Sequence, residues 1–258
     1  MPASEWSAVD AAPDPRRLLS GLDTLRSEPF FAGCKARMTE LLAAMPANRV
    51  LDVGCGTGED AIALAEPAIG IERSVVMCRE ARSRHPDLAL VAGDAAALPI
   101  RAAHVDALRA DRVLQHLPDA PAALREWRRV LRRNGLLVTF DPDLTTARVD
   151  GVDQRVAGVV LNWRRRTRPG AATVHDLAAG LGSAGFVDVR VDECTLYLDD
   201  LDRADGIMGI ATWGRAAGDA GLLSGDDARD WSESVRGAAR AGTLRYRCTY
   251  ILAAARAG

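Results

Sequence analysis

Short apolar runs alternate with amphipathic, helix-like stretches along the first half of this 258-residue chain. The apolar runs span residues 50–53, 68–71, 88–92, 105–110 and 136–140. Ser74 precedes one stretch of helical periodicity and Asp119 precedes another, and both residue types commonly cap helix N-termini. Apolar runs that alternate with helices in this way predict βαβ units and a parallel sheet.

The second half of the chain departs from this simple alternation. Residues 186–198 and 243–255 alternate apolar and polar positions, which predicts two further strands. Residues 144–172 and 199–240 contain helical patterns that interrupt the alternation, and we expect them to be two insertions. The fold class is therefore α/β, with a doubly wound, seven-stranded, mostly parallel sheet.

The N-terminal residues 1–42 read as a helical segment ahead of the first strand. Residues 1–15 are rich in alanine, proline, aspartate and serine, and we expect them to begin as a loose tail. We see no internal repeat, and the whole chain, 1–258, is predicted to be one domain.

A glycine-rich turn follows the first strand and carries the strongest chemical signal. Asp52 lies inside the apolar run, Gly54, Gly56 and Gly58 follow at every second position, and residues 60–66 favour a helix. Glycines allow positive φ and let a ligand approach the backbone closely. The N-terminus of the helix that follows attracts polar or anionic groups. This stretch therefore predicts a ligand-binding turn.

Two acidic positions sharpen the prediction. Glu72 ends the second apolar run and follows Gly54 at close to the roughly 20 positions at which a carboxylate grips ribose hydroxyls. Asp94 follows the third run, where a carboxylate can accept a hydrogen bond from an exocyclic amine. Together with their neighbours Arg73 and Ala95, these residues predict a nucleoside site.

The ordered set of motifs resembles the class I S-adenosylmethionine-dependent methyltransferases. The set is LDVGCGTG, an acid after the second strand, GDAAALP, VDALRADRVLQHLPD and RVLRRNGLLVTFDPD. The likeness covers residues from about 35 to 141, and the chain is most similar to the small-molecule methyltransferases of bacterial natural-product pathways. The resemblance implies a Rossmann-like methyltransferase fold, an antiparallel final strand and S-adenosyl-L-methionine as cofactor.

The resemblance also implies roles for two basic residues. Lys35, ahead of the first strand, is expected to face the methionine end of the cofactor, although a solvated helix face is the alternative. Arg112, just past the fourth strand, is expected near the same end. The candidate cofactor-binding residues are thus Lys35, Asp52, Gly54, Cys55, Gly56, Gly58, Glu72, Arg73, Asp94, Ala95 and Arg112.

Methyl transfer from a sulfonium requires no metal and no covalent enzyme intermediate, so we expect no metal site. Its demands are alignment of donor and acceptor and exclusion of water. His116 and Asp141 follow the fourth and fifth strands, and either is a candidate general base. For His116 the alternative is a structural role at the start of a helix.

The acceptor is less well defined by the sequence. The resemblance implies that the two insertions are cap insertions over the active site. A lining of side chains in or next to them, namely Trp163, Tyr197, Met208 and Trp213, would suit an apolar or aromatic acceptor. Residues 164–168 form the one strong basic cluster, which could bind an anionic substrate. A solvated helix end is the preferred interpretation of that cluster.

Composition narrows the possible partners. The net charge is −2 and no block of five or six like charges occurs, which argues against a nucleic-acid or acidic-membrane partner. The five cysteines are scattered and form no C-x-x-C pair, so a disulfide framework or structural zinc site is not expected. The N-terminus lacks an apolar signal sequence and no run of 18 apolar residues occurs, which predicts a cytoplasmic protein.

Three functional classes follow from these observations. The leading one is methyl transfer to a small molecule, at oxygen, nitrogen or carbon. The second keeps the cofactor fold as a scaffold for ligand binding or a non-methylating reaction such as cyclisation. The third is a nicotinamide-dependent oxidoreductase, which the glycine spacing and Asp94 disfavour. The acceptor, the methylated atom and the oligomeric state are not defined by the sequence.

Overall fold

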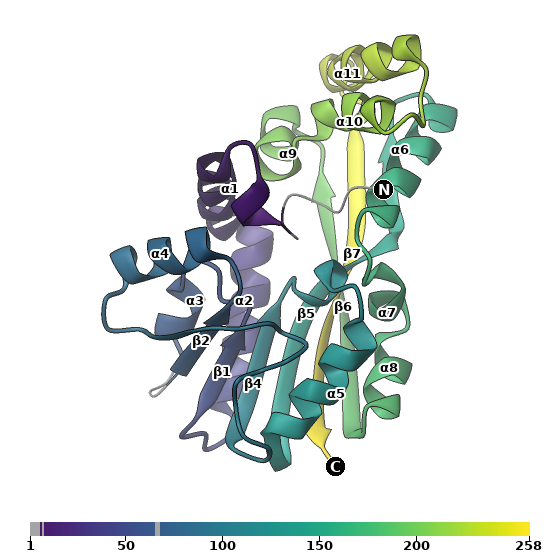
Figure 1. Ribbon diagram of the computed structural model, residues 1–258. Coiled ribbons are helices and arrows are strands. Elements are labelled where there is room, and N and C mark those ends of the chain that lie inside the picture. Colours follow the sequence, from purple (N-terminus) through teal and green to yellow (C-terminus); the bar gives the residue numbers. More distant parts are fainter. Residues whose placement is uncertain (1–5, 7, 65–67) are drawn as a thin grey trace.

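The computed structural model describes residues 6, 8–64 and 68–258, which form one seven-stranded sheet flanked by helices (Figure 1). The strand order is β3-β2-β1-β4-β5-β7-β6. Strand β7 runs antiparallel to both neighbours, and the remaining strands are parallel to one another. The predicted sheet with an antiparallel final strand is confirmed. The strands are β1 (Val50–Val53), β2 (Ala68–Glu72), β3 (Ala89–Ala92), β4 (Val105–Asp111), β5 (Leu131–Asp150), β6 (Phe186–Leu198) and β7 (Arg245–Ala257).

Helices cover both faces of the sheet and build a cap above it (Figure 1). The helices of the sheet layers are α1 (Pro15–Ser27), α2 (Pro29–Ala43), α3 (Glu59–Ile62), α4 (Val75–Arg84), α5 (Ala120–Val130), α7 (Ala171–His175) and α8 (Leu177–Ser183). The cap contains α6 (Gln154–Arg166), α9 (Leu201–Met208), α10 (Trp213–Asp219) and α11 (Gly225–Arg240). Short 3₁₀ turns occupy Val9–Ala11, Leu114–His116 and Ile210–Thr212.

Helix starts follow the capping residues that the sequence predicts. The Ser74 hydroxyl accepts the Met77 N–H at 3.2 Å, and the Asp119 carboxylate accepts the Ala122 N–H at 2.9 Å. Helix α5 then buries Trp127 completely against the sheet. The indole N–H of Trp127 donates to the Ala95 carbonyl at 2.9 Å. The amphipathic face of α5 thus fixes the loop that follows β3.

Strands β5 and β7 extend from the sheet into the cap, where β7 rises beside α6 and α10 (Figure 1). The sequence predicts that the fifth strand ends near residue 140 and that a helix occupies 148–167. Pairing with β7 instead continues to Asp150 after a register break between Asp143 and Arg148, and α6 begins at Gln154. Asp153 provides the cap, because its carboxylate accepts the Arg155 N–H at 2.8 Å.

The loose tail is predicted for the start of residues 1–15, of which residues 1–5 and 7 lie outside the described part of the chain; the described remainder is held in place. Among its described residues, Val9 is buried and Asp10 reaches across to the start of α4. The Asp10 carboxylate accepts the Ser74 hydroxyl at 2.6 Å and the N–H groups of Val75 and Val76 at 2.9 and 3.0 Å. The segment is therefore anchored beside the carboxyl end of β2.

Two shorter predictions also change. The helix expected over residues 60–66 is observed as Glu59–Ile62, and its predicted last residues lie outside the described part of the chain. Thr173 precedes a further helical pattern in the sequence, which predicts one helix there; the structure instead has α7 and α8, separated by Asp176. Among the helices that the structure describes, none combines the length and apolarity needed to cross a bilayer.

Candidate functional site

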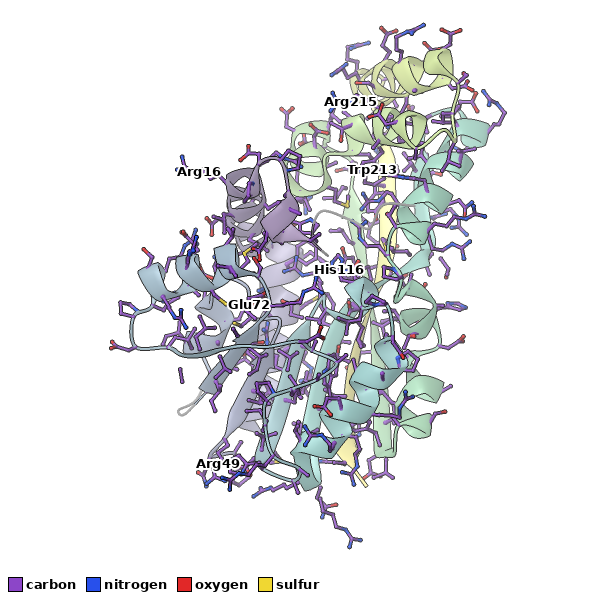
Figure 2. The ribbon with its side chains drawn as sticks, viewed as in Figure 1. Arg16, Arg49, Glu72, His116, Trp213 and Arg215 are labelled. Atoms are coloured by element: carbon purple, nitrogen blue, oxygen red, sulfur yellow. The ribbon has the colours of Figure 1, made fainter. Side chains whose placement is uncertain are left out.

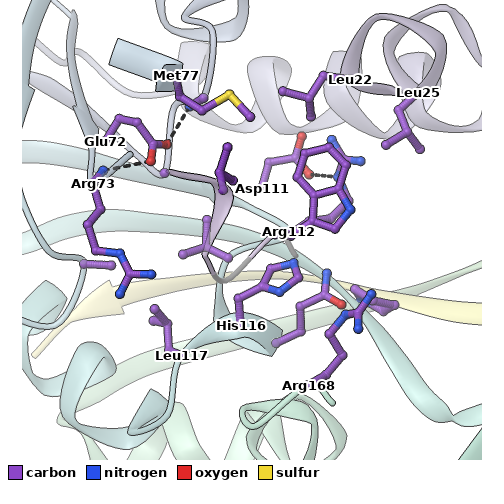
Figure 3. A pocket seen from close by; sticks show the side chains of 18 of the residues that line it. Leu22, Leu25, Glu72, Arg73, Met77, Asp111, Arg112, His116, Leu117 and Arg168 are labelled. Carbon is purple, nitrogen blue, oxygen red and sulfur yellow. Dashed lines mark hydrogen bonds and ion pairs between the residues drawn. The ribbon is translucent and has the colours of Figure 1, made fainter. Parts of the chain in front are cut away.

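A cavity of about 290 Å³ lies at the carboxyl ends of the parallel strands, below the cap. Open α/β sheets usually bind ligands at this edge. In the close-up view, Glu72 and Met77 lie at one end, Arg168 at the other, and His116 between them, with Leu22 and Leu25 opposite (Figure 3). One continuous space therefore joins side chains from the sheet, α1 and the cap.

The glycine turn forms one wall of this cavity. Gly54, Gly56 and Gly58 have φ values of +69°, +57° and +88°, which side chains other than glycine rarely adopt. A Cβ at Gly54 would lie 2.6 Å from a methyl group of Val113, so the turn packs directly against the segment after β4. Gly54 and Gly56 line the cavity, whereas Gly58 caps α3 away from it.

Glu72 ends β2 with its carboxylate held in one orientation. One oxygen accepts the Gly56 N–H at 3.0 Å, and the other accepts the N–H groups of Arg73 and Ser74 at 2.8 Å each. Three backbone donors thus fix the carboxylate at the cavity wall, where Figure 3 shows Glu72 beside Arg73. A carboxylate can accept further hydrogen bonds, so Glu72 suits a pair of ribose hydroxyls.

Asp94 and Ala95 line the adjacent wall. The Asp94 carboxylate accepts the Ala96 N–H at 2.8 Å, which shapes the loop after β3. The Ala95 carbonyl is occupied by Trp127, as described above. These contacts orient the loop toward the same space as Glu72.

Lys35 and Asp52 were predicted to contact the cofactor, but neither lines the cavity in the described residues. Both belong to a buried charge cluster centred on Arg109 of β4, which lies directly opposite Asp52 of β1. Arg109 contacts Asp52 at 3.0 Å, Asp60 at 3.1 Å and Asp111 at 3.2 Å. Lys35 pairs with Asp60 and, at 3.1 Å, with Asp111. The cluster supports the glycine turn from below.

Burial and charge perturb the acids of this cluster in opposite directions. Burial raises the pKa of Asp52 to about 6 despite Arg109, and its Oδ2 atom has no hydrogen-bond partner among the described residues. Burial also acts to raise the pKa of Asp111, but Arg112, Lys35 and Arg109 together lower it below its usual range. Asp111 therefore stays charged where it meets the cavity.

Arg112 does lie in the cavity, as predicted. Its backbone adopts φ +57° and its N–H donates to the Phe140 carbonyl at 2.6 Å. The guanidinium pairs with Asp111 at 3.0 Å and lies 5.1 Å from the centre of the Phe31 ring. Cys55, the remaining candidate, does not line the cavity; its sulfur packs against Gly70 of β2.

The two candidate bases occupy different places. His116 lines the cavity, and burial, with contributions from Arg168 and Arg112, lowers its pKa well below the usual range. Asp141 is fully buried and does not line the cavity. Its carboxylate accepts the N–H groups of Leu114 and Gln115 at 3.3 and 3.2 Å, and burial raises its pKa to about 8. Asp141 therefore holds the turn that carries His116.

The acceptor-side lining predicted from the insertions is largely different in the structure. Met208 lines the cavity, whereas Trp163 packs against the core and Tyr197 is 63% exposed. Trp213 is buried in the cap, above the level of His116 in Figure 2. Burial of an aromatic residue inside the cap could not be told from exposure to a pocket by sequence position alone.

Several lining residues were not identified from the sequence, namely Leu22 and Leu25 of α1 and Tyr246 and Tyr250 of β7. Arg164 and Arg168 also line the cavity; they belong to the basic cluster for which the sequence offers an anion site but favours a solvated helix end. The apolar stripe of α1 is visible in the sequence but looks like an ordinary core face. The two tyrosines are four positions apart on a strand and thus share one face, which is the only signal that could have found them.

Comparisons with known proteins agree with this geometry. Residues 51–139 match the methyltransferase domain family. The chain is 34% identical over 228 residues to an uncharacterized 37.1 kDa protein in a transposon of Streptomyces fradiae, covering 84% of this chain and 66% of that protein. It is 33% identical over 167 residues to a protein of Mycobacterium tuberculosis named as a probable S-adenosylmethionine-dependent methyltransferase, covering 62% and 57%.

A shorter match links the chain to a demethylmenaquinone methyltransferase of Beutenbergia cavernae, with 39% identity over 105 residues, 40% of this chain and 44% of the relative. The chain thus spans between 44% and 66% of the length of these three relatives. Among solved structures, the YcgJ protein of Bacillus subtilis shares the fold, with a TM-score of 0.62 at 18% identity over 87% of this chain and 98% of that one. The chain therefore carries a methyltransferase domain of the class I, S-adenosylmethionine-dependent type.

Proposed function

We propose that this protein transfers the methyl group of S-adenosyl-L-methionine to oxygen, nitrogen or carbon of a small-molecule acceptor. The observation that carries the proposal is the single cavity in which a fixed carboxylate, Glu72, shares one space with the cap-side residues Arg168 and Met208. The first end suits a nucleoside, and we assign the second end, which cap residues line, to the acceptor. The demethylmenaquinone methyltransferase relative, whose name gives a small-molecule substrate, supports this class.

We assign the cofactor's parts to residues of the cavity as follows. Glu72 binds the ribose hydroxyls, and the loop at Asp94 and Ala95 receives the adenine. Asp111 and Arg112, which present opposite charges, receive the ammonium and carboxylate of the methionine part. Gly54 and Gly56 line the cavity without a side chain, so a ligand can lie directly against the backbone of the turn.

The remaining candidates support the cofactor indirectly. Lys35 and Asp52 balance the charges beneath the glycine turn, and Gly58 and Cys55 shape it. When bound, S-adenosyl-L-methionine supplies an electrophilic methyl group on a sulfonium. The protein's part is to align the acceptor with that group and to exclude water.

His116 is the residue placed to receive the acceptor's proton. Its lowered pKa keeps the imidazole neutral at pH 7 but makes it a weaker base than an exposed histidine. In this role a ring nitrogen accepts the proton of a hydroxyl or amine while the acceptor's bond to the methyl carbon forms and the carbon–sulfur bond breaks. Asp141 acts on this step only by orienting the turn beneath His116. We place the reaction in bacterial secondary metabolism, in a reducing cytoplasm that suits five unpaired cysteines.

Calorimetric titration with S-adenosyl-L-methionine, S-adenosylhomocysteine and NADH tests the cofactor assignment. We expect both adenosyl-sulfur ligands to bind and NADH not to bind. Glu72→Ala should weaken their binding roughly 5- to 150-fold, which is the cost of about 1–3 kcal/mol for hydrogen-bond partners left unpaired. Glu233→Ala, an exposed position on α11, is the matched control.

Three outcomes would contradict the proposal in different ways. Binding of NADH alone would assign the site to a dinucleotide. An unchanged dissociation constant for Glu72→Ala would remove Glu72 from the ribose site. Tight cofactor binding without formation of S-adenosylhomocysteine across a broad acceptor screen would favour the scaffold alternative, such as a cyclisation.

A further inference from the structure

Two arginines at the end of α6 enter the acceptor side of the cavity. Arg164 lies in the last helical turn and Arg168 follows four positions later. Both are half-buried and line the cavity, while Arg165 and Arg166 between them are exposed. The sequence favours a solvated helix end for this cluster, and the structure confirms that interpretation only for the middle pair. Arg164 and Arg168 are turned inward.

Neither inward arginine has a carboxylate within ion-pairing distance among the residues that the structure describes. The Arg164 guanidinium lies 3.8 Å from the centre of the Trp213 ring, and Arg168 donates to the Thr167 hydroxyl at 3.0 Å. Arg112, the cavity arginine on the cofactor side, is by contrast paired with Asp111. The acceptor side of the cavity therefore holds two arginine side chains whose charges no carboxylate of the described residues neutralises.

Partial burial of two neighbouring arginines lowers the pKa of each side chain. Burial, together with repulsion from Arg164, lowers the pKa of Arg168 to about 9. Burial likewise lowers the pKa of Arg164. Partly desolvated like charges are unfavourable unless an anion joins them, and the planar guanidinium fork matches carboxylate and phosphate oxygens.

The surroundings of the pair point to an anion that belongs to a larger molecule. The acidic residues among the described lining are Glu72, Asp94 and Asp111, and all of them lie at the cofactor side. Near the arginines, Tyr246 and Tyr250 keep their hydroxyl protons because burial raises the pKa of each phenol. Leu144, Ile207 and Met208 add apolar surface to the same region.

We propose that Arg164 and Arg168 form an anion subsite for the acceptor, which carries one carboxylate or phosphate group on a mainly apolar body. This inference rests on the proposed function and names the substrate class for it. Stacking on Trp213 holds Arg164 in place without consuming its charge, and His116 lies between the subsite and Glu72 (Figure 3). The anion thus anchors the acceptor with its nucleophile directed toward His116.

The test uses the full chain saturated with S-adenosylhomocysteine and three probes with one skeleton. The probes are 2-naphthoate, 2-naphthyl phosphate and neutral 2-naphthamide, titrated by calorimetry. We expect one of the two anions to bind at least tenfold more tightly than the amide, and the tighter anion distinguishes a carboxylate acceptor from a phosphate one. Arg164→Gln and Arg168→Gln should each weaken that anion about tenfold or more.

Arg165→Gln and Arg166→Gln are the matched controls, because they remove the same charge from the exposed face of the same helix. They should leave the anion's dissociation constant within about twofold of wild type. Equal binding of all three probes would overturn the subsite, and so would equal losses in the inward and outward variants. Loss of S-adenosylhomocysteine binding in Arg164→Gln and Arg168→Gln would instead assign the pair to the cofactor.

The proposed function fails by a different result. If wild-type protein does not bind S-adenosylhomocysteine, the cofactor assignment is wrong whatever the naphthyl probes do. If S-adenosylhomocysteine binds and the probes show no preference for charge, only the anion subsite is wrong.

Discussion

Replacing Arg109 by methionine removes the central cation of the buried cluster beneath the glycine turn. The cluster balances Lys35, Arg109 and Arg112 against three aspartates. Methionine fills a similar volume but leaves one uncompensated negative charge. Breaking a buried ion pair by removing one partner typically costs about 3–5 kcal/mol of unfolding free energy. We expect a loss in that range at pH 7–8, measured by urea denaturation.

The pH dependence of this loss distinguishes the charge effect from simple packing damage. In wild-type protein the pKa of Asp52 is about 6, compared with 3.8 for an ordinary aspartate, a difference of about 3 kcal/mol. Because the folded pKa lies above the unfolded one, the folded state binds the extra proton and stability falls as the pH rises from about 4 through 6. Without Arg109 the pKa of Asp52 rises further, so the penalty continues to grow above pH 6.

Arg109→Met should therefore be least destabilised near pH 5 and most destabilised near pH 8. The double variant Asp52→Asn with Arg109→Met should recover part of the loss at pH 8, since it removes the stranded carboxylate. An unfolding free energy within about 1 kcal/mol of wild type, or a loss that does not shrink on acidification, would refute this account of the cluster.

Two further perturbations address the cavity itself. In steady-state kinetics, His116→Gln should reduce turnover of a hydroxyl or amine acceptor about 10²- to 10⁴-fold, while calorimetry should show that S-adenosylhomocysteine binds as in wild type. Undiminished turnover would exclude His116 as the base. Asp10→Ala should release the N-terminal segment from α4, lower the free energy of unfolding by about 1 kcal/mol and accelerate cofactor dissociation in stopped-flow fluorescence. An unchanged dissociation rate would show that the Asp10 hydrogen bonds do not retain the cofactor.

The sheet and the glycine turn could be predicted because their signals are local. Apolar runs, capping residues and the spacing of Glu72 from Gly54 are properties of short stretches, and they place Gly54, Gly56, Glu72 and Asp94 at one edge. Asp52 could not be assigned in this way. Its environment depends on Arg109, which is 57 positions later and becomes its partner only through the register of β1 with β4.

On the acceptor side of the cavity, even more of the lining depends on contacts between residues that are far apart in the sequence. The spacing of Arg164 and Arg168 places them on one face of a helix, but nothing nearby in the sequence shows that this face meets Tyr246 of β7 and Trp213 of α10. Those contacts depend on the continuation of β5 to Asp150 along β7, whereas the sequence predicts that the fifth strand ends near residue 140. The last strand, predicted over 243–255, is observed at Arg245–Ala257. The basic cluster consequently looked like a solvated helix end.

The continuous course of β7 has a consequence for how ligands reach the cavity. Its 13 residues span about 40 Å and connect the base of the sheet to the cap without a hinge. Because β5 pairs with it along much of this length, we expect the cap and the sheet to behave as one rigid unit. We therefore expect ligand exchange at the opposite wall, where the short segment around Val9 is held by the Asp10 hydrogen bonds and by the packing of Val9 with Leu18 and Met77.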